Sequence, residues 1–459
     1  MKKTYIYPIL LILAAITLLP SCVVDNEEVT PDEYCYISSF RIGTLKRTIY
    51  TVNEEGEDSA YTVTFSGDLY PMSIDQRTLT IENRDSLPYG TRVKAALATV
   101  DYNGVLVYKE AEDEEWRSYS ASDSIDFSAP VEFTVYSSSG NSKRTYKVKL
   151  NVHKQDGKRF VWNSLAESNE IEALTERKLI ANNDNLIMMG KTAMGAVVCA
   201  TRPTDMTSNW TVSATTGAGM ADVSSLQADL NGLMMMSTTT GAILQSENGI
   251  DWLPITDVKD GRKLVGCGYG YLFAITNGKL ESSYNQGADW ADENLDDEET
   301  RLPDSNCTLI QCLQGNGYQR LVLAGNNASA ADKNVEVWSK AWIEPINYEP
   351  DVKWMYYPHT ADNKYLCPQM DPLFILPYNN GIIAFGGASI DGKNKAFNSM
   401  LYSPDYGLTW KEDSELMLPS QLKGCTDLAA ATVDHDNFIW IVAGKTTWRG
   451  RLNRLGYGK

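Results

Sequence analysis

The stretch SPDYGLTW at residues 403–410 has two relatives upstream, SYNQGADW at residues 283–290 and the shorter SENGIDW at residues 246–252. An Asp or Asn side-chain oxygen in such a stretch can accept hydrogen bonds from backbone N–H groups two residues further on and so close a tight turn. Glycine supplies the positive φ that the turn needs, and tryptophan can bury a large ring between sheets. We therefore interpret the stretch as scaffold rather than as a catalytic device. The residues given this structural role are Ser246, Asn248, Gly249, Trp252, Ser283, Asn285, Gly287, Trp290, Ser403, Asp405, Gly407 and Trp410.

These stretches belong to a longer repeat that begins at residue 159. Each unit has three short apolar runs separated by polar turns, and in five of the six units a turn that carries a tryptophan follows the third run. Trp210, Trp252 and Trp290 are 42 and 38 residues apart, and longer loops widen the next spacings to 64 and 56 residues, at Trp354 and Trp410. Four short strands in about 40–50 residues is the period of a β-propeller blade. Six units predict an all-β, six-bladed β-propeller over residues 159–459.

The sixth unit has the three apolar runs but not the tryptophan-bearing turn and outer strand that follow them in the other five units. The segment FVWNSL at residues 160–165 precedes the first unit and contains a tryptophan among apolar residues, like the other outer strands. An open ring would leave unpaired strand edges, which favour aggregation. We therefore predict that residues 160–165 pair antiparallel with residues 448–455 as the outer strand of the sixth blade.

Residues 33–153 form a separate β-rich region. Segments such as AYTVTF (60–65), RVKAALATV (92–100) and VEFTVYS (131–137) alternate apolar and polar residues or nearly so, with turn signals between them. Short segments of period two, with no helical pattern between them, predict an antiparallel β-sandwich. Residues 154–158 are polar and are predicted to be a linker.

The first 21 residues read as an export signal. Two lysines precede an apolar run of about 14 residues, which is shorter than the roughly 20 that a membrane span needs. LPSC at residues 19–22 resembles a bacterial lipobox, and this resemblance implies cleavage before Cys22 and attachment of lipid to it. Residues 22–32 are interpreted as an acidic tether. DNEE at residues 25–28 resembles the export signal of Bacteroidota surface lipoproteins, so we expect a lipid-anchored protein of the outer membrane that faces the exterior, with a periplasmic position as the alternative.

Charge and cysteine content narrow the possible partners. The formal net charge is −18, which repels phosphate backbones and argues against nucleic acid as a partner. Seven cysteines follow Cys22 without a CxxC pair, so we interpret them as buried small hydrophobic residues rather than as metal ligands or disulfides. We expect no metal, no cofactor and a monomeric ectodomain.

The repeated stretch resembles the Asp-box of sialidase-like propellers, where it lies on the outer rim, away from the central site. The whole arrangement resembles a family of Bacteroidota surface lipoproteins of unknown function, with an N-terminal Ig-like domain and a C-terminal Asp-box or kelch-like β-propeller. This resemblance implies that the 33–153 region is Ig-like, and it implies no activity.

The sequence favours binding over catalysis. It contains no P-loop, GxSxG or HExxH motif. A sialidase needs three converging arginines, whereas Arg449, Arg451 and Arg454 are expected on one strand. A glycan-active hydrolase or lyase of sialidase-like propeller type is the alternative, and paired carboxylates for glycoside hydrolysis stay open. An assembly or scaffold role within an envelope complex is the third possibility.

The long segments 355–371 and 388–398 are predicted to lie on the propeller face that joins fourth to first and second to third strands. Recognition residues often lie on such loops. The first loop carries our candidate binding residues for a glycan or a protein, with coverage of the blade's own core as the alternative. These are Tyr356, Tyr357, His359 and Tyr365.

Overall fold

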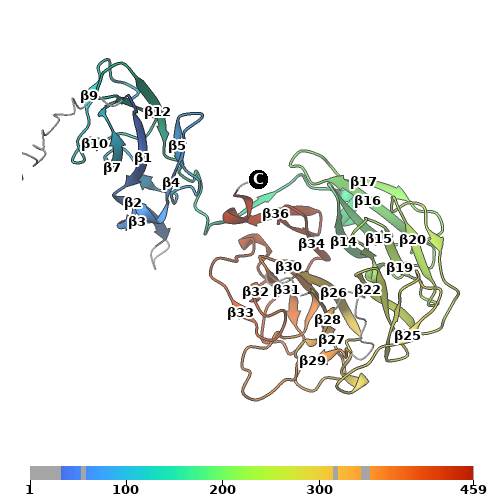
Figure 1. Cartoon of the computed structure of the whole chain (residues 1–459). Coiled ribbons are helices and arrows are strands. Elements are labelled where there is room, and N and C mark those ends of the chain that lie inside the picture. The colour runs from blue at the N-terminus through green and yellow to red at the C-terminus, as the bar shows by residue number, and fades with distance from the viewer. Residues whose placement is uncertain (1–32, 53–57, 314–318, 343–351, 458–459) are drawn as a thin grey trace, which may run out of the picture. The chain divides into compact units, whose positions relative to one another are not determined.

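The computed structural model of the chain describes residues 33–52, 58–313, 319–342 and 352–457. Within these ranges β-strands predominate, and contacts divide the chain into one unit that ends at Asp156 and another that begins at Gly157 (Figure 1). No helix in the described ranges is both long and apolar enough to cross a membrane. The short helices are α2 (Asn169–Glu172), η1 (Gly67–Leu69), η2 (Val223–Ser225), η3 (Glu299–Arg301), η5 (Ser420–Leu422) and η6 (Asn453–Gly456).

The first unit contains three sheets. One has the strand order β1-β7-β10, with β1 (Tyr36–Ile42), β7 (Ala96–Asn103) and β10 (Ser124–Ile125). The second has the order β4-β5-β12-β11-β8-β9, with β4 (Met72–Asp75), β5 (Thr80–Asn83), β12 (Lys143–Lys149), β11 (Val131–Tyr136), β8 (Val105–Lys109) and β9 (Arg117–Ser118). The third has the order β3-β2-β6, with β3 (Asp58–Ser66), β2 (Thr44–Val52) and β6 (Thr91–Arg92).

Two features of this unit differ from the sequence expectation. The pairing of β5 with β12 is parallel, whereas the sequence predicted an antiparallel sandwich; β11 pairs antiparallel with the other edge of β12. The apolar run at residues 92–100 is not one strand, since a turn separates the end of β6 from β7.

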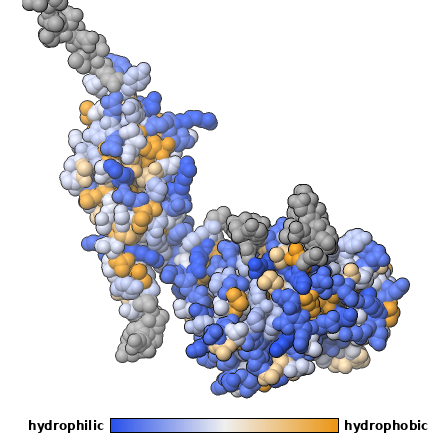
Figure 2. Space-filling view, turned by 60° about the horizontal axis from the view of Figure 1, so that its bottom comes forward, coloured by the Kyte–Doolittle hydropathy of each residue, from blue (hydrophilic) through white to orange (hydrophobic). Residues whose placement is uncertain are grey.

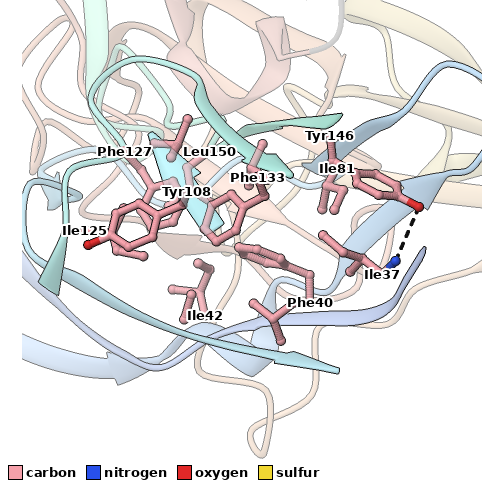
Figure 3. Packing of buried hydrophobic residues seen from close by; sticks show 14 of the residues in the cluster. Ile37, Phe40, Ile42, Ile81, Tyr108, Ile125, Phe127, Phe133, Tyr146 and Leu150 are labelled. Carbon is pink, nitrogen blue, oxygen red and sulfur yellow. Dashed lines mark hydrogen bonds between the residues drawn. The ribbon is translucent and has the colours of Figure 1, made fainter. Parts of the chain in front are cut away.

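The first two sheets share one hydrophobic core (Figure 3). Phe40 from β1 meets Phe133 from β11 edge to face, with ring centroids 5.3 Å apart. Tyr108 from β8 stacks on Phe133 at 5.7 Å. The Tyr146 hydroxyl accepts a hydrogen bond from the Ile37 backbone N–H at 3.3 Å, which ties β12 to β1. Aromatic packing of this kind typically contributes about 0.5–1.5 kcal/mol per pair beyond area burial.

The second unit contains six four-stranded antiparallel sheets, and each corresponds to one sequence unit. The first four are β14 (Glu176–Asn182), β15 (Asn185–Lys191), β16 (Val197–Pro203), β17 (Thr211–Ala214); β18 (Gln227–Ala228), β19 (Met234–Ser237), β20 (Ile243–Ser246), β21 (Leu253–Pro254); β22 (Arg262–Gly268), β23 (Tyr271–Thr276), β24 (Lys279–Ser283), β25 (Ala291–Asp292); and β26 (Ser305–Leu313), β27 (Gln319–Asn326), β28 (Glu336–Trp342), β29 (Met355–Tyr356). The last two are β30 (Met370–Tyr378), β31 (Gly381–Ser389), β32 (Leu401–Ser403), β33 (Lys411–Glu412); and β34 (Ala429–Val433), β35 (Ile439–Ala443), β36 (Thr446–Leu452), β13 (Phe160–Ser164).

The first strands of the six sheets contact one another in sequence order, and β34 of the sixth contacts β14 of the first. The sheets therefore surround a common axis, with the first strands innermost (Figure 1). Bulky rings fill the spaces further out, where Trp252, Trp338, Trp354 and Trp440 are fully buried.

The predicted strand pairing is confirmed over residues 160–164 and 448–452, whereas residues 453–455 belong to η6 and not to the strand. β13 pairs antiparallel with β36, from Phe160 opposite Leu452 to Ser164 opposite Trp448. The indole N–H of Trp162 donates to the Met417 carbonyl at 2.6 Å. The strand before the first sheet thus supplies the fourth strand of the last.

Candidate functional site

The turn at residues 403–410 closes through its own side chains. The Ser403 hydroxyl donates to Asp405 Oδ1 at 2.7 Å and accepts from the Gly407 N–H at 2.7 Å. Asp405 Oδ1 also accepts from the Thr409 N–H at 2.8 Å, and the Trp410 indole donates to the Gly407 carbonyl at 3.0 Å. All of these bonds are internal, so the shared residues hold the turn together.

The turns at residues 246–252 and 283–290 repeat this pattern. The hydroxyls of Ser246 and Ser283 each accept from the glycine N–H at 2.9 Å, and each indole donates to the glycine carbonyl at 2.9 Å. The acceptor side chain reaches N–H groups two to four residues ahead, so its span is wider than the two residues expected from sequence.

Each turn also presses its glycine against the preceding sheet. Gly407 has φ +108°, and a Cβ there would lie 2.7 Å from Val337 Cγ1 on β28. Gly249 has φ +74°, and its Cβ would lie 2.8 Å from the Cys199 sulfur on β16. A side chain is therefore excluded both by conformation and by space. The turns seal the contacts between successive sheets.

The four candidate binding residues do not form one open surface. Tyr356 on β29 is 8% exposed, and its hydroxyl donates to Glu336 Oε2 at 2.6 Å. Burial, followed by this hydrogen bond, raises the pKa of Tyr356. The side chain of His359 is 7% exposed, and its ring nitrogens contact Asp332 Oδ2 at 2.6 Å and the Val335 carbonyl at 3.1 Å. These two candidates therefore belong to an internal network.

Tyr357 and Tyr365 lie apart from that network. Tyr357 is half-buried, and its hydroxyl accepts from Arg320 Nη1 at 2.7 Å. Tyr365 is 50% exposed, with the ammonium of Lys411 4.0 Å from its ring centroid. Of the four, Tyr365 alone presents a largely open ring.

A cavity of about 680 Å³ occupies the axis of the second unit. The first strand of every one of the six sheets contributes to its wall. Met235 on β19, Gln245 on β20, Leu272 on β23 and Ile255 also line it. Turns between first and second strands, at residues 229–233 and 268–271, form one part of the remaining wall, and Tyr284 and Gln286 between a third and a fourth strand form another. In an antiparallel meander these turns share one face, which is opposite to the face of segments 355–371 and 388–398. The cavity is thus bounded by turns on the face that the sequence did not single out.

Several polar side chains line the cavity without protein partners. Gln227, Gln245 and Gln286 make no side-chain hydrogen bond within the described residues. Gln311 is held differently, since its Oε1 accepts from the Tyr269 N–H at 3.0 Å. Three amides are therefore available to a ligand.

On the face seen in Figure 2, hydrophobic residues form only small separate patches among hydrophilic ones.

Aromatic rings form one side of the cavity mouth. Tyr269 stacks on Trp342 at a centroid distance of 5.2 Å and an interplanar angle of 15°. Tyr271 meets Trp342 edge-on at 4.9 Å and lies 6.4 Å from the ring of Tyr284. Tyr284 is 66% exposed. Tyr284 and Gln286 occupy variable positions of a repeated turn, and that variability is the one sequence signal that could have identified them.

The cavity wall contains few ionisable groups. Lys178 on β14 is half-buried, and burial lowers its pKa. Burial raises the pKa of the Cys267 thiol to about 12. The carboxylate of Asp229 accepts from the N–H groups of Asn231 at 2.9 Å and Leu233 at 2.8 Å, so it closes a turn. It is the one carboxylate among the lining residues.

The arginines considered for a sialidase site lie elsewhere. Arg449 and Arg451 are on β36, whereas Arg454 lies in η6, which corrects the expectation of a single strand. The guanidinium groups of Arg449 and Arg451 lie 3.5 and 4.0 Å from the ring centroid of Phe438. None of the three lines the axial cavity. The described ranges contain no group of three or more His, Cys, Asp or Glu side chains placed to hold a metal ion.

Two family models match the chain. Residues 156–459 match the DUF6242 beta propeller domain, and residues 40–150 match the N-terminal domain of the same family, described as a domain of unknown function. None of the curated proteins compared with the chain matches it.

Solved structures similar to the chain share little sequence with it. YCF48 from Cyanidioschyzon merolae is 11% identical, with TM-score 0.34 over 63% of this chain and 98% of that one. AofleA from Arthrobotrys oligospora is 12% identical, with TM-score 0.36 over 62% of this chain and 84% of that one. A DUF4623 family protein from Bacteroides eggerthii is 11% identical, with TM-score 0.33 over 90% of this chain and 98% of that one. Likenesses of this size carry no inference about function.

Proposed function

Because the chain belongs to the DUF6242 family, whose C-terminal domain is a β-propeller, we propose that the six sheets are the blades of one ring and that this ring is a non-catalytic module that binds a glycan. β13 completes the sixth blade and so closes the ring. The binding site in this proposal is the axial cavity, not the face that carries segment 355–371.

The observation that carries the proposal is the combination of unpartnered amides and aromatic rings around one cavity. Amide groups donate and accept hydrogen bonds at once, which suits sugar hydroxyls. Tyrosine rings offer flat apolar faces with polar tips, and these suit the faces of sugar rings. A cavity of about 680 Å³ falls in the range typical of small-ligand sites. Gln227, Gln245 and Gln286 would bind hydroxyls, and Tyr284 would contact a sugar ring.

Glycan hydrolysis is the weaker candidate. Most glycoside hydrolases need two carboxyl groups that flank the scissile bond. Among the lining residues the cavity offers Asp229 alone, and its Oδ1 accepts two backbone hydrogen bonds within a turn. The cavity wall therefore favours binding over hydrolysis.

A glycan array with the intact protein tests this function. We expect binding to a defined glycan without turnover, and an affinity loss of about tenfold or more in Tyr284→Ala, since one stacked ring typically accounts for this much. The matched control is Tyr365→Ala, on the opposite face, which should bind as the parent does. Loss of binding in Tyr365→Ala instead of Tyr284→Ala would move the site to the 355–371 face. Release of cleavage products, or no glycan bound, would contradict the proposal.

We also propose that the protein is a Bacteroidota outer-membrane lipoprotein that faces the exterior, with an Ig-like first unit. Support comes from LPSC and DNEE, which lie outside the described residues, and from the shared core of the two larger N-terminal sheets. Cys22→Ser should leave the protein without lipid and in the soluble fraction. Retention of this variant in membranes after signal cleavage would refute the anchor. Protease added to intact cells should remove the ectodomain, and full protection of the ectodomain would indicate a periplasmic position.

A further inference from the structure

Lys178 lies near the centre of the ring and has no ion-pair partner among the residues that the structure describes. It lies on β14, the innermost strand of its sheet, and its side chain forms part of the cavity wall. Within the described residues its ammonium makes no ion pair and no hydrogen bond. Lys191 and Lys259 of the same unit differ, since Lys191 lies 2.9 Å from a carboxylate oxygen of Glu176 and Lys259 lies 2.6 Å from one of Glu281.

The surroundings of Lys178 do not neutralise it. The groups that act on it electrostatically are Lys263 on β22, Asp222 just before η2 and Cys307 on β26. Asp222 already pairs with Lys263, with 3.6 Å between their nearest N and O atoms. Burial raises the pKa of the Cys307 thiol to about 11, so this thiol is neutral at pH 7. The one carboxylate of the cavity wall, Asp229, accepts hydrogen bonds within its own turn and forms no ion pair with Lys178 among the described residues.

A positively charged ammonium group without a carboxylate partner, as at Lys178, is unusual in the wall of a cavity. Partly buried ammonium groups are costly unless a partner compensates them, and a chain with net charge −18 offers many carboxylates. A ligand that carries one negative charge would supply the missing partner. An uncompensated ionisable group in a cleft is a recognised indicator of a binding site.

We infer that the cavity selects an acidic glycan, in which a sugar carboxylate or sulfate lies against the ammonium of Lys178. This inference rests on the proposed glycan-binding function and adds the substrate class. The neutral part of the same sugar chain would meet Gln227 and Gln245 along the wall and Tyr284 at the mouth. A charge-assisted hydrogen bond to Lys178 is about twice as strong as a neutral one, so it gives the acidic sugar its advantage.

The first experiment measures protection of Lys178 from limited acetylation in the full-length protein, read by peptide mass spectrometry. The probes are galacturonate, inorganic sulfate and neutral methyl galactoside, and exposed Lys364 is the internal control. We expect galacturonate, sulfate or both to slow acetylation of Lys178 several-fold and to leave Lys364 unchanged. Protection by galacturonate alone identifies a uronate, and protection by sulfate alone identifies a sulfated sugar. Equal protection by methyl galactoside, or no protection by any probe, overturns the inference.

The second experiment compares trigalacturonate with its neutral methyl ester by calorimetric titration. We expect the parent protein to prefer the acid by about tenfold or more. Lys178→Met should remove this preference and Lys178→Arg should keep it. The control Lys279→Met removes a surface charge that lies 3.5 Å from a carboxylate oxygen of Asp292 and should change nothing.

The outcomes separate the two levels of the proposal. Equal binding of acid and ester by the parent overturns the acidic-glycan inference unless sulfate alone protected Lys178, and an unchanged preference in Lys178→Met overturns it in either case; both results leave glycan binding intact. Anion protection of Lys178 together with a blank glycan array overturns glycan binding and leaves an anion site at Lys178. Thermal melting shows whether Lys178→Met is folded, and because it replaces an uncompensated charge by an apolar chain, its melting temperature should not fall.

Discussion

At the scale of single residues, the three tryptophan-bearing turns show a matched pair of side chains. Asn248 Nδ2 donates to Asp251 Oδ2 at 2.9 Å, and Asn285 Nδ2 donates to Asp289 Oδ2 at 2.8 Å. In the third turn the roles are reversed, since Asp405 Oδ2 accepts from the Thr409 hydroxyl at 2.6 Å. An Asn at the first position of the pair is therefore matched by an Asp at the second, whereas an Asp at the first position is matched by a Thr.

This pairing predicts that Asn285→Asp destabilises the protein. The change would bring two carboxylates together where an amide now donates, and like charges at contact distance repel. We expect the free energy of unfolding to fall by about 1 kcal/mol or more, measured by urea denaturation. Adding Asp289→Thr should restore stability, because it recreates the pair seen at Asp405 and Thr409. A double variant no more stable than Asn285→Asp would show that the side chains are not coupled.

In the turn at residues 403–410, loss of the Trp410 indole should lower the free energy of unfolding more than loss of the Asp405 carboxylate. Trp410 is 3% exposed, so Trp410→Ala should cost about 3–5 kcal/mol through the cavity it leaves. Asp405→Ala should cost about 1–2 kcal/mol through its lost hydrogen bonds. Both values come from chemical unfolding, with exposed Glu412→Ala as the control. A folded variant that keeps full stability yet loses glycan binding would contradict the structural role of the turn.

At the scale of elements, the decisive feature is the pairing of β13 with β36. Trp162 packs over Gly450, where a Cβ would come within 2.3 Å of the indole ring. Phe160 joins the hydrophobic cluster between the fifth and sixth sheets and stacks on Trp162 at a centroid distance of 5.1 Å. β13 therefore both completes a sheet and covers its core.

Two deletions test this closure. Removal of residues 23–153 should leave a folded second unit, because the two units are separate compact bodies. Removal of residues 23–168 also takes β13, so it should expose the edge of β36 and lower the melting temperature by 10 °C or more, roughly the effect of a few kcal/mol. Calorimetry of the two deletion proteins measures the difference. Equal melting temperatures would show that β13 does not close the ring.

At the scale of the whole molecule, the cysteine side chains are mostly part of the hydrophobic core. All seven cysteines in the described residues are free, and five of them are buried. The burial of these five agrees with the prediction that they are small hydrophobic residues, whereas Cys267 and Cys425 are half-buried. Burial raises the pKa of Cys199 to about 11 and that of Cys312 to about 12.

We therefore expect the buried cysteine thiols of the native protein to be alkylated slowly. Thiolate is the reactive form, so burial and a raised pKa both protect these side chains at pH 8. Iodoacetamide should modify the buried cysteines of the native protein far more slowly than those of the protein in denaturant, with or without reductant. Mass spectrometry of intact and digested protein measures this. A mass lower by two hydrogens per pair, restored by reductant, would reveal a disulfide.

The sequence by itself determined the features that depend on neighbours along the chain. The repeat of apolar runs identified the four-stranded sheets, because five of the six form from consecutive segments and the sixth takes three consecutive strands and β13. SPDYGLTW predicted its own turn, because the donors and acceptors of that turn lie within eight residues. The closing strand was predictable because the sixth unit lacked a fourth apolar run and FVWNSL was available to supply it.

Only the tertiary structure decided where a ligand could bind. The cavity joins residues from six first strands that are far apart in the chain, and no local pattern links Lys178 with Gln245 or Tyr284. In the sequence, Tyr356 and His359 could bind a ligand or cover the blade's own core, and hydrogen bonds to Glu336 and Asp332 show that they belong to the interior. Burial and charge balance arise when distant strands pack around one axis, and for that reason the fold was predictable from sequence and the site was not.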